Sequence, residues 1–227
     1  MTASITRDRL LCRLVIAVAL AAGAASPADA EIIWTNYTTG SGLANNLVRG
    51  VYATGSTIYA ATQGGGLSIS TNNGSGFTNY TLTNGLGSNT VRGVYAAGST
   101  IYAATTGGLS ISTNGGANWI NYTTGSGLLS NNVLGVYAAG STIYAATSGG
   151  LSISTNSGAS WINYTTGSGL GSDIVNGVYA AGSTIYAATS GGLSVGVVAV
   201  PEPSTYAMAL AGLACGGSVV FRRRRAR

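Results

Sequence analysis

The middle of this chain consists of four copies of one unit. The tripeptide Gly-Val-Tyr recurs at 50–52, 93–95, 135–137 and 177–179, so successive copies begin 43, 42 and 42 residues apart. A period near 42 is typical of a propeller blade or of a helical repeat. Helical repeats are excluded because glycine, serine, threonine and asparagine break every stretch longer than about eight residues. The repeat therefore predicts a series of β-units.

Each unit predicts four short strands. In the second copy these strands cover 91–96, 100–105, 109–112 and 119–122. Turns rich in glycine and asparagine separate them, as tight hairpins require. The third strand alternates apolar and polar residues, which indicates one buried face. Four antiparallel strands joined by tight turns are typical of a propeller blade.

The two ends of the repeat array are offset. The fourth copy stops after its third strand, Leu193–Val195, whereas a segment like the missing fourth strand, Trp34–Tyr37, precedes the first copy. We therefore predict an all-β fold: a small β-propeller of four roughly 42-residue, four-stranded blades, closed by the N-terminal strand, which would remove an exposed edge. A chance truncation of the array is the alternative to closure. A parallel β-helix is the rival architecture, but its coils are usually much shorter.

Two motifs within the unit resemble known propeller repeats. Residues 85–92, Gly-Leu-Gly-Ser-Asn-Thr-Val-Arg, resemble the opening of the two-component-regulator propeller repeat. Residues 112–119 resemble an Asp-box hairpin, with Asn72, Asn114 and Asn156 where that family has aspartate. Asparagine can make the same local turn bond. Asp-boxes are structural in the families that carry them, so this resemblance implies a propeller and no particular chemistry.

The C-terminal tail has three parts. Pro201, Glu202 and Pro203 precede an uncharged apolar run at 206–221, and the run is followed by four arginines, Arg222, Arg223, Arg224 and Arg225. As a helix the run would reach ~24 Å against a hydrocarbon core of ~30 Å, a borderline span. The arginines would hold that end in the cytoplasm.

The order of these parts resembles the PEP-CTERM sorting tail of bacterial envelope proteins. The resemblance implies export, transient retention in the inner membrane and processing by an exosortase-type enzyme. An ordinary weak C-terminal anchor is the alternative, and the Pro-Glu-Pro before the run argues against it.

The N-terminus predicts a signal peptide. Three arginines precede an apolar run at 14–25, and Ala28 and Ala30 frame a small-x-small cleavage site before Glu31. A permanent membrane helix is disfavoured because a run of 12 residues is too short. The predicted organisation is a signal peptide at 1–30, a propeller at 31–196, a linker at 197–205, a transmembrane helix at 206–221 and a basic cytoplasmic tail at 222–227.

Composition excludes most chemistry for the repeat domain. The chain has no histidine or lysine, and its two cysteines, Cys12 and Cys215, lie in the terminal segments. Between residues 32 and 200 the only charged residues are Arg49, Arg92 and Asp173. Paired carboxylates for hydrolysis, clustered metal ligands and a basic patch for nucleic acid are all missing. The sequence predicts no catalytic, cofactor or metal site and no nucleic-acid partner, and the two arginines are interpreted as solvated charges at strand ends.

Tyrosine is the one recurrent functional candidate. Twelve of the thirteen tyrosines recur three per unit, as at Tyr95, Tyr102 and Tyr122. Exposed tyrosines are good platforms for sugars, but strict repetition favours core or half-buried packing.

Together the repeats and the composition predict a non-enzymatic propeller. The resemblance of the tail implies that this propeller is exported to the cell envelope or extracellular matrix, with a structural or interactive role in association with exopolysaccharide. A lectin-like module that binds carbohydrate or protein is the alternative, and a glycan-active enzyme is the third possibility.

Overall fold

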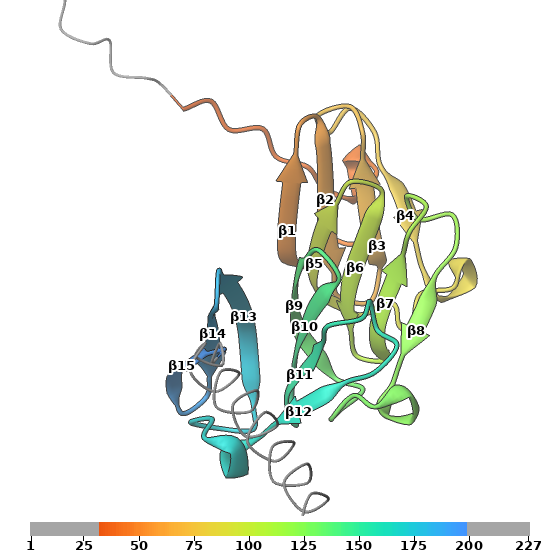
Figure 1. Ribbon diagram of the computed structural model, residues 1–227. Helices are drawn as coiled ribbons and strands as arrows, with labels where there is room; N and C mark the ends of the chain where they lie inside the picture. The colour runs from red at the N-terminus through yellow and green to blue at the C-terminus, as the bar shows by residue number, and fades with distance from the viewer. Residues whose placement is uncertain (1–31, 199–227) are drawn as a thin grey trace, which may run out of the picture. The chain divides into compact units, whose positions relative to one another are not determined.

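The structure is a computed structural model that describes residues 32–198. In this range the chain forms successive antiparallel sheets (Figure 1). The first sheet contains β1 (Val48–Thr54), β2 (Thr57–Thr62), β3 (Gly66–Ser70) and β4 (Thr78–Tyr80). The second contains β5 (Val91–Ala97), β6 (Thr100–Thr105), β7 (Gly108–Ser112) and β8 (Ile120–Tyr122). The third contains β9 (Val133–Ala139), β10 (Thr142–Thr147), β11 (Gly150–Ser154) and β12 (Ile162–Tyr164). The fourth contains β13 (Val175–Ala181), β14 (Thr184–Thr189) and β15 (Gly192–Val197).

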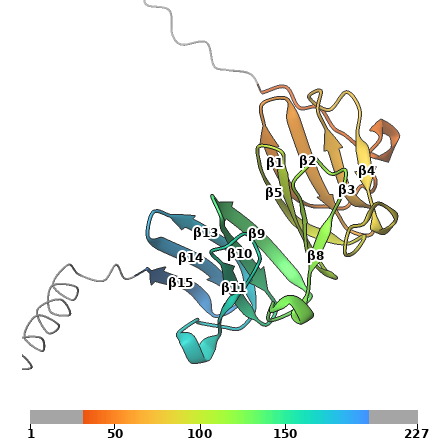
Figure 2. The ribbon, with the colours of Figure 1, turned by 45° about the vertical axis from the view of Figure 1, so that its right-hand side comes forward.

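Each sheet is a meander in which neighbouring strands follow one another in sequence, as Figures 1 and 2 show. One-turn 3-10 helices precede the first strand of each sheet: η1 (Thr39–Ser41), η2 (Leu82–Asn84), η3 (Thr124–Ser126) and η4 (Thr166–Ser168). The predicted all-β repeat of propeller-like blades is confirmed. In the second copy the four predicted strands fall within a residue or two of the observed ones.

The predicted closure by the N-terminal strand is wrong in this structure. The fourth sheet has three strands, and residues 32–38, which include Trp34–Tyr37, form no strand. The Trp34 side chain is 81% exposed. Tyr37 instead packs edge-on against Phe77, which lies just before β4, with ring centroids 5.6 Å apart. These contacts hold Tyr37 on the first sheet, and the outer edge of β15 has no partner strand among the described residues.

The predicted membrane helix at 206–221 lies outside the described residues. Within residues 32–198, no helix has the length and apolar character needed to cross a bilayer.

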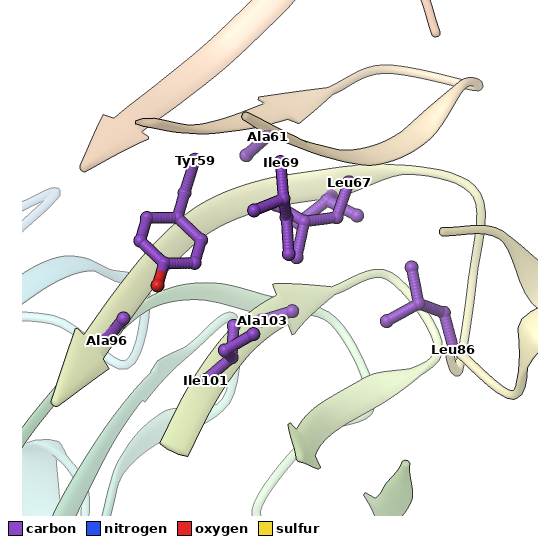
Figure 3. Close-up of a cluster of buried hydrophobic side chains, with 9 residues drawn as sticks. Tyr59, Ala61, Leu67, Ile69, Leu86, Ala96, Ile101 and Ala103 are labelled. Carbon is purple, nitrogen blue, oxygen red and sulfur yellow. The ribbon is translucent and has the colours of Figure 1, made fainter. Parts of the chain in front are cut away.

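The core lies between consecutive blades. The first blade contributes one set of buried side chains, which we call its leading face: Tyr59, Ala61, Leu67 and Ile69. The second blade meets it with its trailing face: Leu86, Val91, Ala96, Ile101 and Ala103. Figure 3 shows these side chains meeting between the two sheets. The same arrangement recurs between the second and third blades and between the third and fourth.

A glycine lets the first strands of neighbouring blades approach closely. A Cβ atom added at Gly50 would lie 3.0 Å from the carbonyl oxygen of Arg92 and 3.2 Å from the Cα of Gly93. A Cβ atom added at Gly135 would likewise lie 3.3 Å from the Cα atom of Gly177. Glycine at 50 and at 135 therefore lets the strand backbones of neighbouring blades come this close, because a Cβ atom at either position would crowd the next strand.

Burial between blades predicts which leucines matter for stability. Leu109 is fully buried between the second and third blades, whereas Leu82 is 54% exposed. We expect Leu109→Ala to lower the free energy of unfolding by roughly 2–5 kcal/mol, since it leaves a cavity at a packed junction. Leu82→Ala, the matched control, should change it by less than about 0.5 kcal/mol. Chemical denaturation of the exported protein measures both, and equal effects would contradict the assignment of the core.

Candidate functional site

A continuous row of tyrosines crosses all four blades. The first strand of each blade contributes one ring, namely Tyr52, Tyr95, Tyr137 and Tyr179. Successive ring centroids are 5.0, 5.1 and 4.9 Å apart, and the rings are tilted by 54–58°. These distances are typical of attractive aromatic contacts. The row exists because the close approach of the glycines brings the next-but-one residue of each strand into contact with its counterpart.

A second set of tyrosines contacts this row from the neighbouring strand of each sheet. Tyr59, Tyr102 and Tyr144 are buried, and each ring centroid lies 6.1 Å from that of the row tyrosine in its own sheet. The interpretation of the repeated tyrosines as core or half-buried residues is confirmed for this row. Tyr179, at the end of the row, is the exception, with 54% of its surface exposed.

Burial changes the acidity of these phenols. Burial raises the pKa of Tyr102. Burial also raises the pKa of Tyr59 and of Tyr144, and the adjacent row tyrosine, Tyr52 or Tyr137, adds a smaller increase. The pKa of Tyr95 is raised first by burial and then by the surrounding tyrosines, beginning with Tyr52. These four phenols therefore stay neutral at physiological pH.

The two arginines of the repeat domain lie on β-bulges. Arg49 and Arg92 each occupy the unpaired position just before the Gly-Val-Tyr glycine. Arg49 donates a hydrogen bond to Gln63 in its own blade. Arg92 donates from Nε to Oδ1 of Asn132 in the next blade, at 3.2 Å. Both guanidinium groups therefore interact with neutral amides near the strand ends.

The one carboxylate between residues 32 and 198, that of Asp173, closes a turn. Oδ1 of Asp173 accepts a hydrogen bond from the backbone N–H of Thr166 at 2.6 Å. The corresponding asparagines of the other units make the same bond, at 2.7–2.8 Å: Asn46 with Thr39, Asn89 with Leu82 and Asn131 with Thr124. Asp173 thus performs a structural role that a neutral amide performs in the other three blades.

The Asp-box-like hairpins keep their turn bonds with asparagine in place of aspartate. In the second blade, Ser112 donates to Oδ1 of Asn114 at 2.9 Å, and this same oxygen accepts from the backbone N–H of Asn118 at 2.9 Å. Ser154 and Asn156 repeat the arrangement in the third blade. The expected structural role of these asparagines is confirmed. Within residues 32–198, no group of three or more histidine, cysteine, aspartate or glutamate side chains is arranged to hold a metal ion.

An apolar cleft that the sequence analysis missed lies beside the open edge of the fourth blade. Its volume is about 370 Å³, and its walls include Leu151, Tyr164, Leu170, Val195 and Val197. No charged residue lines it. Only the truncation of the fourth repeat in the sequence could have indicated this cleft.

The residues predicted to direct export all lie outside the described residues. They are the cleavage-site alanines Ala28 and Ala30, the motif Pro201, Glu202 and Pro203, and the arginines Arg222, Arg223, Arg224 and Arg225. A family model does cover most of them: residues 199–225 match the PEP-CTERM protein-sorting motif. This sorting signal implies an exported protein.

Solved structures confirm the propeller resemblance at the level of fold. The extracellular domain of a protein described as a hybrid two component system, BT3049 from B. thetaiotaomicron, superposes with a TM-score of 0.63 at 20% identity, over 75% of this chain and 24% of that one. An ancestral GH74 enzyme gives a TM-score of 0.51 at 23% identity, over 71% of this chain and 25% of that one.

The computationally designed Ika4 protein gives a TM-score of 0.52 at 5% identity, over 67% of this chain and 91% of that one. The chain thus spans about a quarter of the length of the BT3049 and GH74 chains, 24% and 25%, and most of the length of the designed protein. None of the curated proteins matches this chain in sequence.

The raised phenol pKa values predict sensitivity to alkali. An unfolded tyrosine loses its proton near pH 10, before the buried phenols do, so the free energy of unfolding should be constant below about pH 10 and fall above it. Tyr102→Phe removes one of these phenols, so the fall should be smaller in this variant. Denaturation of the exported protein across this range measures the effect, and stability that does not change up to full ionisation would contradict the burial of these side chains.

Proposed function

We propose that this protein is a non-enzymatic propeller module of the cell envelope or extracellular matrix, with a structural or interactive role in contact with exopolysaccharide. The observation that carries the proposal is the role of Asp173. It is the one carboxylate between residues 32 and 200, and it is occupied by a turn bond that asparagine makes in every other blade. Hydrolysis of a glycan needs two positioned acids, and the repeat domain has no histidine, lysine or cysteine to replace them.

The chemistry of the repeat domain suits a neutral polymer. With two arginines and one aspartate between residues 32 and 200, the domain has almost no electrostatic means of attracting a charged partner. What the blades offer in abundance is serine, threonine and asparagine together with tyrosine rings. Hydroxyl-rich polysaccharides are recognised by hydrogen-bonding groups and aromatic faces of this kind.

The sorting signal supports delivery to the outside of the cell. We infer that an exosortase-type enzyme processes the tail after transient retention in the inner membrane, and that the repeat domain then acts at the cell surface or beyond it. The fold similarity to an extracellular domain agrees with this location.

A lectin-like module is the second candidate, and Tyr179 favours it. Its ring contacts that of Tyr137, with centroids 4.9 Å apart and a tilt of 54°, while 54% of the surface of Tyr179 stays exposed, so that its ring is available to a sugar. Retention of the protein on immobilised polysaccharide that is lost in Tyr179→Ala, but kept in Leu82→Ala, would favour this candidate over a structural role.

The non-enzymatic proposal predicts that Asp173 is replaceable. We expect Asp173→Asn to fold with a free energy of unfolding within about 0.5 kcal/mol of the wild type, because three blades already place asparagine here. Retention on polysaccharide should also be unchanged. Thermal unfolding and a retention assay measure these properties. A hydrolytic activity on a glycan that disappears in this variant would overturn the proposal.

The sorting proposal predicts a processing defect. In cells that contain the processing enzyme, replacing both Pro201 and Pro203 with alanine should leave the chain uncut in the inner membrane, because alanine removes the extended, donor-poor backbone of the motif. The matched control replaces the neighbouring Ser204 and Thr205 with alanine and should be processed normally. The mass of the exported protein distinguishes the two results. Normal processing of the proline variant would count against an exosortase-type mechanism.

A further inference from the structure

The array leaves one packing face uncovered at its end. The leading-face leucines Leu67, Leu109 and Leu151 are at most 3% exposed, whereas their counterpart in the fourth blade, Leu193, is 68% exposed. Tyr186 and Val195 of the same face are also exposed. The fourth blade therefore presents to solvent the surface that is buried in the first three.

The first blade carries the complementary surface, which is exposed at Val48 and Ala53, half-buried at Ile58 and buried at Leu43 and Ala60. Its trailing face has the same residue types as those of the other three blades, in the order Leu, Val, Ala, Ile, Ala: Leu43, Val48, Ala53, Ile58 and Ala60. Val48 is 41% exposed, whereas Val91, Val133 and Val175 are fully buried by a preceding blade. The leading face of the fourth blade thus matches the trailing face of the first blade through the same residue types as the three junctions already formed, except that Val195 replaces the isoleucine of the other leading faces.

Tyr37 is already placed as if another blade preceded the first one. At the internal junctions the last tyrosine of each blade packs edge-on against an aromatic ring of the next, Tyr80 on Trp119 at 6.0 Å and Tyr122 on Trp161 at 5.8 Å. Tyr37 packs on Phe77 in the same way, at 5.6 Å. Its hydroxyl also donates to the carbonyl oxygen of Asn73 at 2.9 Å. Tyr37 therefore occupies the place that the last tyrosine of a preceding blade would have.

The fourth blade has an empty place for such a strand. A Cβ atom added at Gly85 would lie 3.7 Å from the Trp119 side chain, and one added at Gly127 would lie 3.4 Å from the Trp161 side chain. Nothing lies within 4 Å of a Cβ atom added at the corresponding Gly169. The apolar cleft beside β15 is lined by Gly169. In the repeat, Trp34 is the residue that corresponds to Trp119 and Trp161.

The hydrogen bonds of the complete blades show what a fourth strand contributes. In the second blade, the Ser110 hydroxyl donates to Oδ1 of Asn121 at 2.6 Å, and Asn121 donates to the carbonyl oxygen of Gly85 at 2.9 Å. In the fourth blade, Ser194 accepts from the backbone N–H of Gly171, as Ser110 does from Gly87. The residue of the repeat that corresponds to Asn121 is Asn36.

We propose that a second copy of this chain supplies the missing partner, so that two chains close one ring of eight blades. The leading face of the fourth blade packs on the trailing face of the partner's first blade, and residues 34–37 of the partner become the fourth strand of the incomplete sheet. Both junctions of the dimer are alike, as a two-fold axis requires.

The partner is a second chain because four blades packed by one repeated contact leave the face of the fourth uncovered. Two chains are required because propellers have about four to eight blades, and eight is the next multiple of four. A two-fold axis that coincides with the central axis of the ring places Val198 of both chains on the same side of the ring. Both tails can then reach one membrane.

The register of the exchanged strand follows from the complete blades. In the second blade Leu109 pairs with Tyr122, Ser110 with Asn121 and Ile111 with Ile120. By equivalence, Leu193 pairs with the second chain's Tyr37, Ser194 with Asn36 and Val195 with Thr35. Residues directly opposite each other have Cα atoms about 4.5–5.5 Å apart, within the range of a disulfide.

Cysteine cross-linking in the full chain tests this register. The two native cysteines are first replaced by Cys12→Ser and Cys215→Ser, and Thr35→Cys and Val195→Cys are then introduced into one chain. After oxidation in cells that export the protein, we expect one disulfide-linked species with twice the mass of a single chain on a non-reducing gel. In the matched control, Thr35→Cys is combined with Ser194→Cys, whose side chain points to the opposite face of the sheet, and no linked dimer should form.

The other outcomes overturn the proposal. A disulfide within one chain would mean that the array closes on itself, and a ladder of larger species would mean an open filament. Absence of any link, or equal linking in the control, would rule out the register.

A second measurement does not depend on cysteine. Leu193 and Ile120 are both exposed in the single chain, at 68% and 61%, but only Leu193 belongs to the proposed junction. Light scattering of the detergent-solubilised full chain should give the mass of two chains for the wild type and for Ile120→Arg, and of one chain for Leu193→Arg. A wild type with the mass of one chain, or a Leu193→Arg variant that stays dimeric, would refute the exchange.

Discussion

The packing of one blade's leading face on the next blade's trailing face is the interaction on which the rest of the structure depends. A single small sheet cannot bury enough apolar surface to be stable alone, so each blade needs a neighbour. Here the neighbours meet through leucine, isoleucine, valine and alanine, with Leu67, Leu109 and Leu151 almost completely buried. The domain has no cysteine for a disulfide and three charges between residues 32 and 200, so no other strong interaction replaces this packing.

The same packing arranges the polar groups that define the chemistry of the domain. Close contact at Gly50, Gly93, Gly135 and Gly177 aligns the tyrosine row, whose rings stay 4.9–5.1 Å apart across three junctions. Asparagine, serine and threonine are used inside the blades to close turns, and Asp173 is used in the same way. The result is a nearly uncharged surface, and this supports the proposal that the domain contacts a neutral polymer.

The uncovered faces follow from the identity of the repeats. When every junction is built from the same contacts, the last blade must offer the same surface as the others, whether or not a fifth blade exists. The offset of the repeat leaves the fourth blade without its outer strand and places the corresponding segment beside the first blade. A chain of this design is incomplete at both ends in a complementary way, which is the geometric condition for closure by a second copy.

The blade is predictable from the sequence: the period of 42 to 43, the four strands and their turns, and the turn-closing role of the asparagines depend on local periodicity and turn chemistry. The sorting tail is predictable for another reason, because the order of its parts resembles a known family. Contacts between blades set the features that the periodicity of the sequence does not predict. Whether Trp34–Tyr37 pairs with β15 depends on the rotation accumulated over three junctions, and this rotation is set by side-chain packing rather than by pattern. The alignment of Tyr52, Tyr95, Tyr137 and Tyr179 into one row, and the cleft beside Gly169, arise only from contacts between blades.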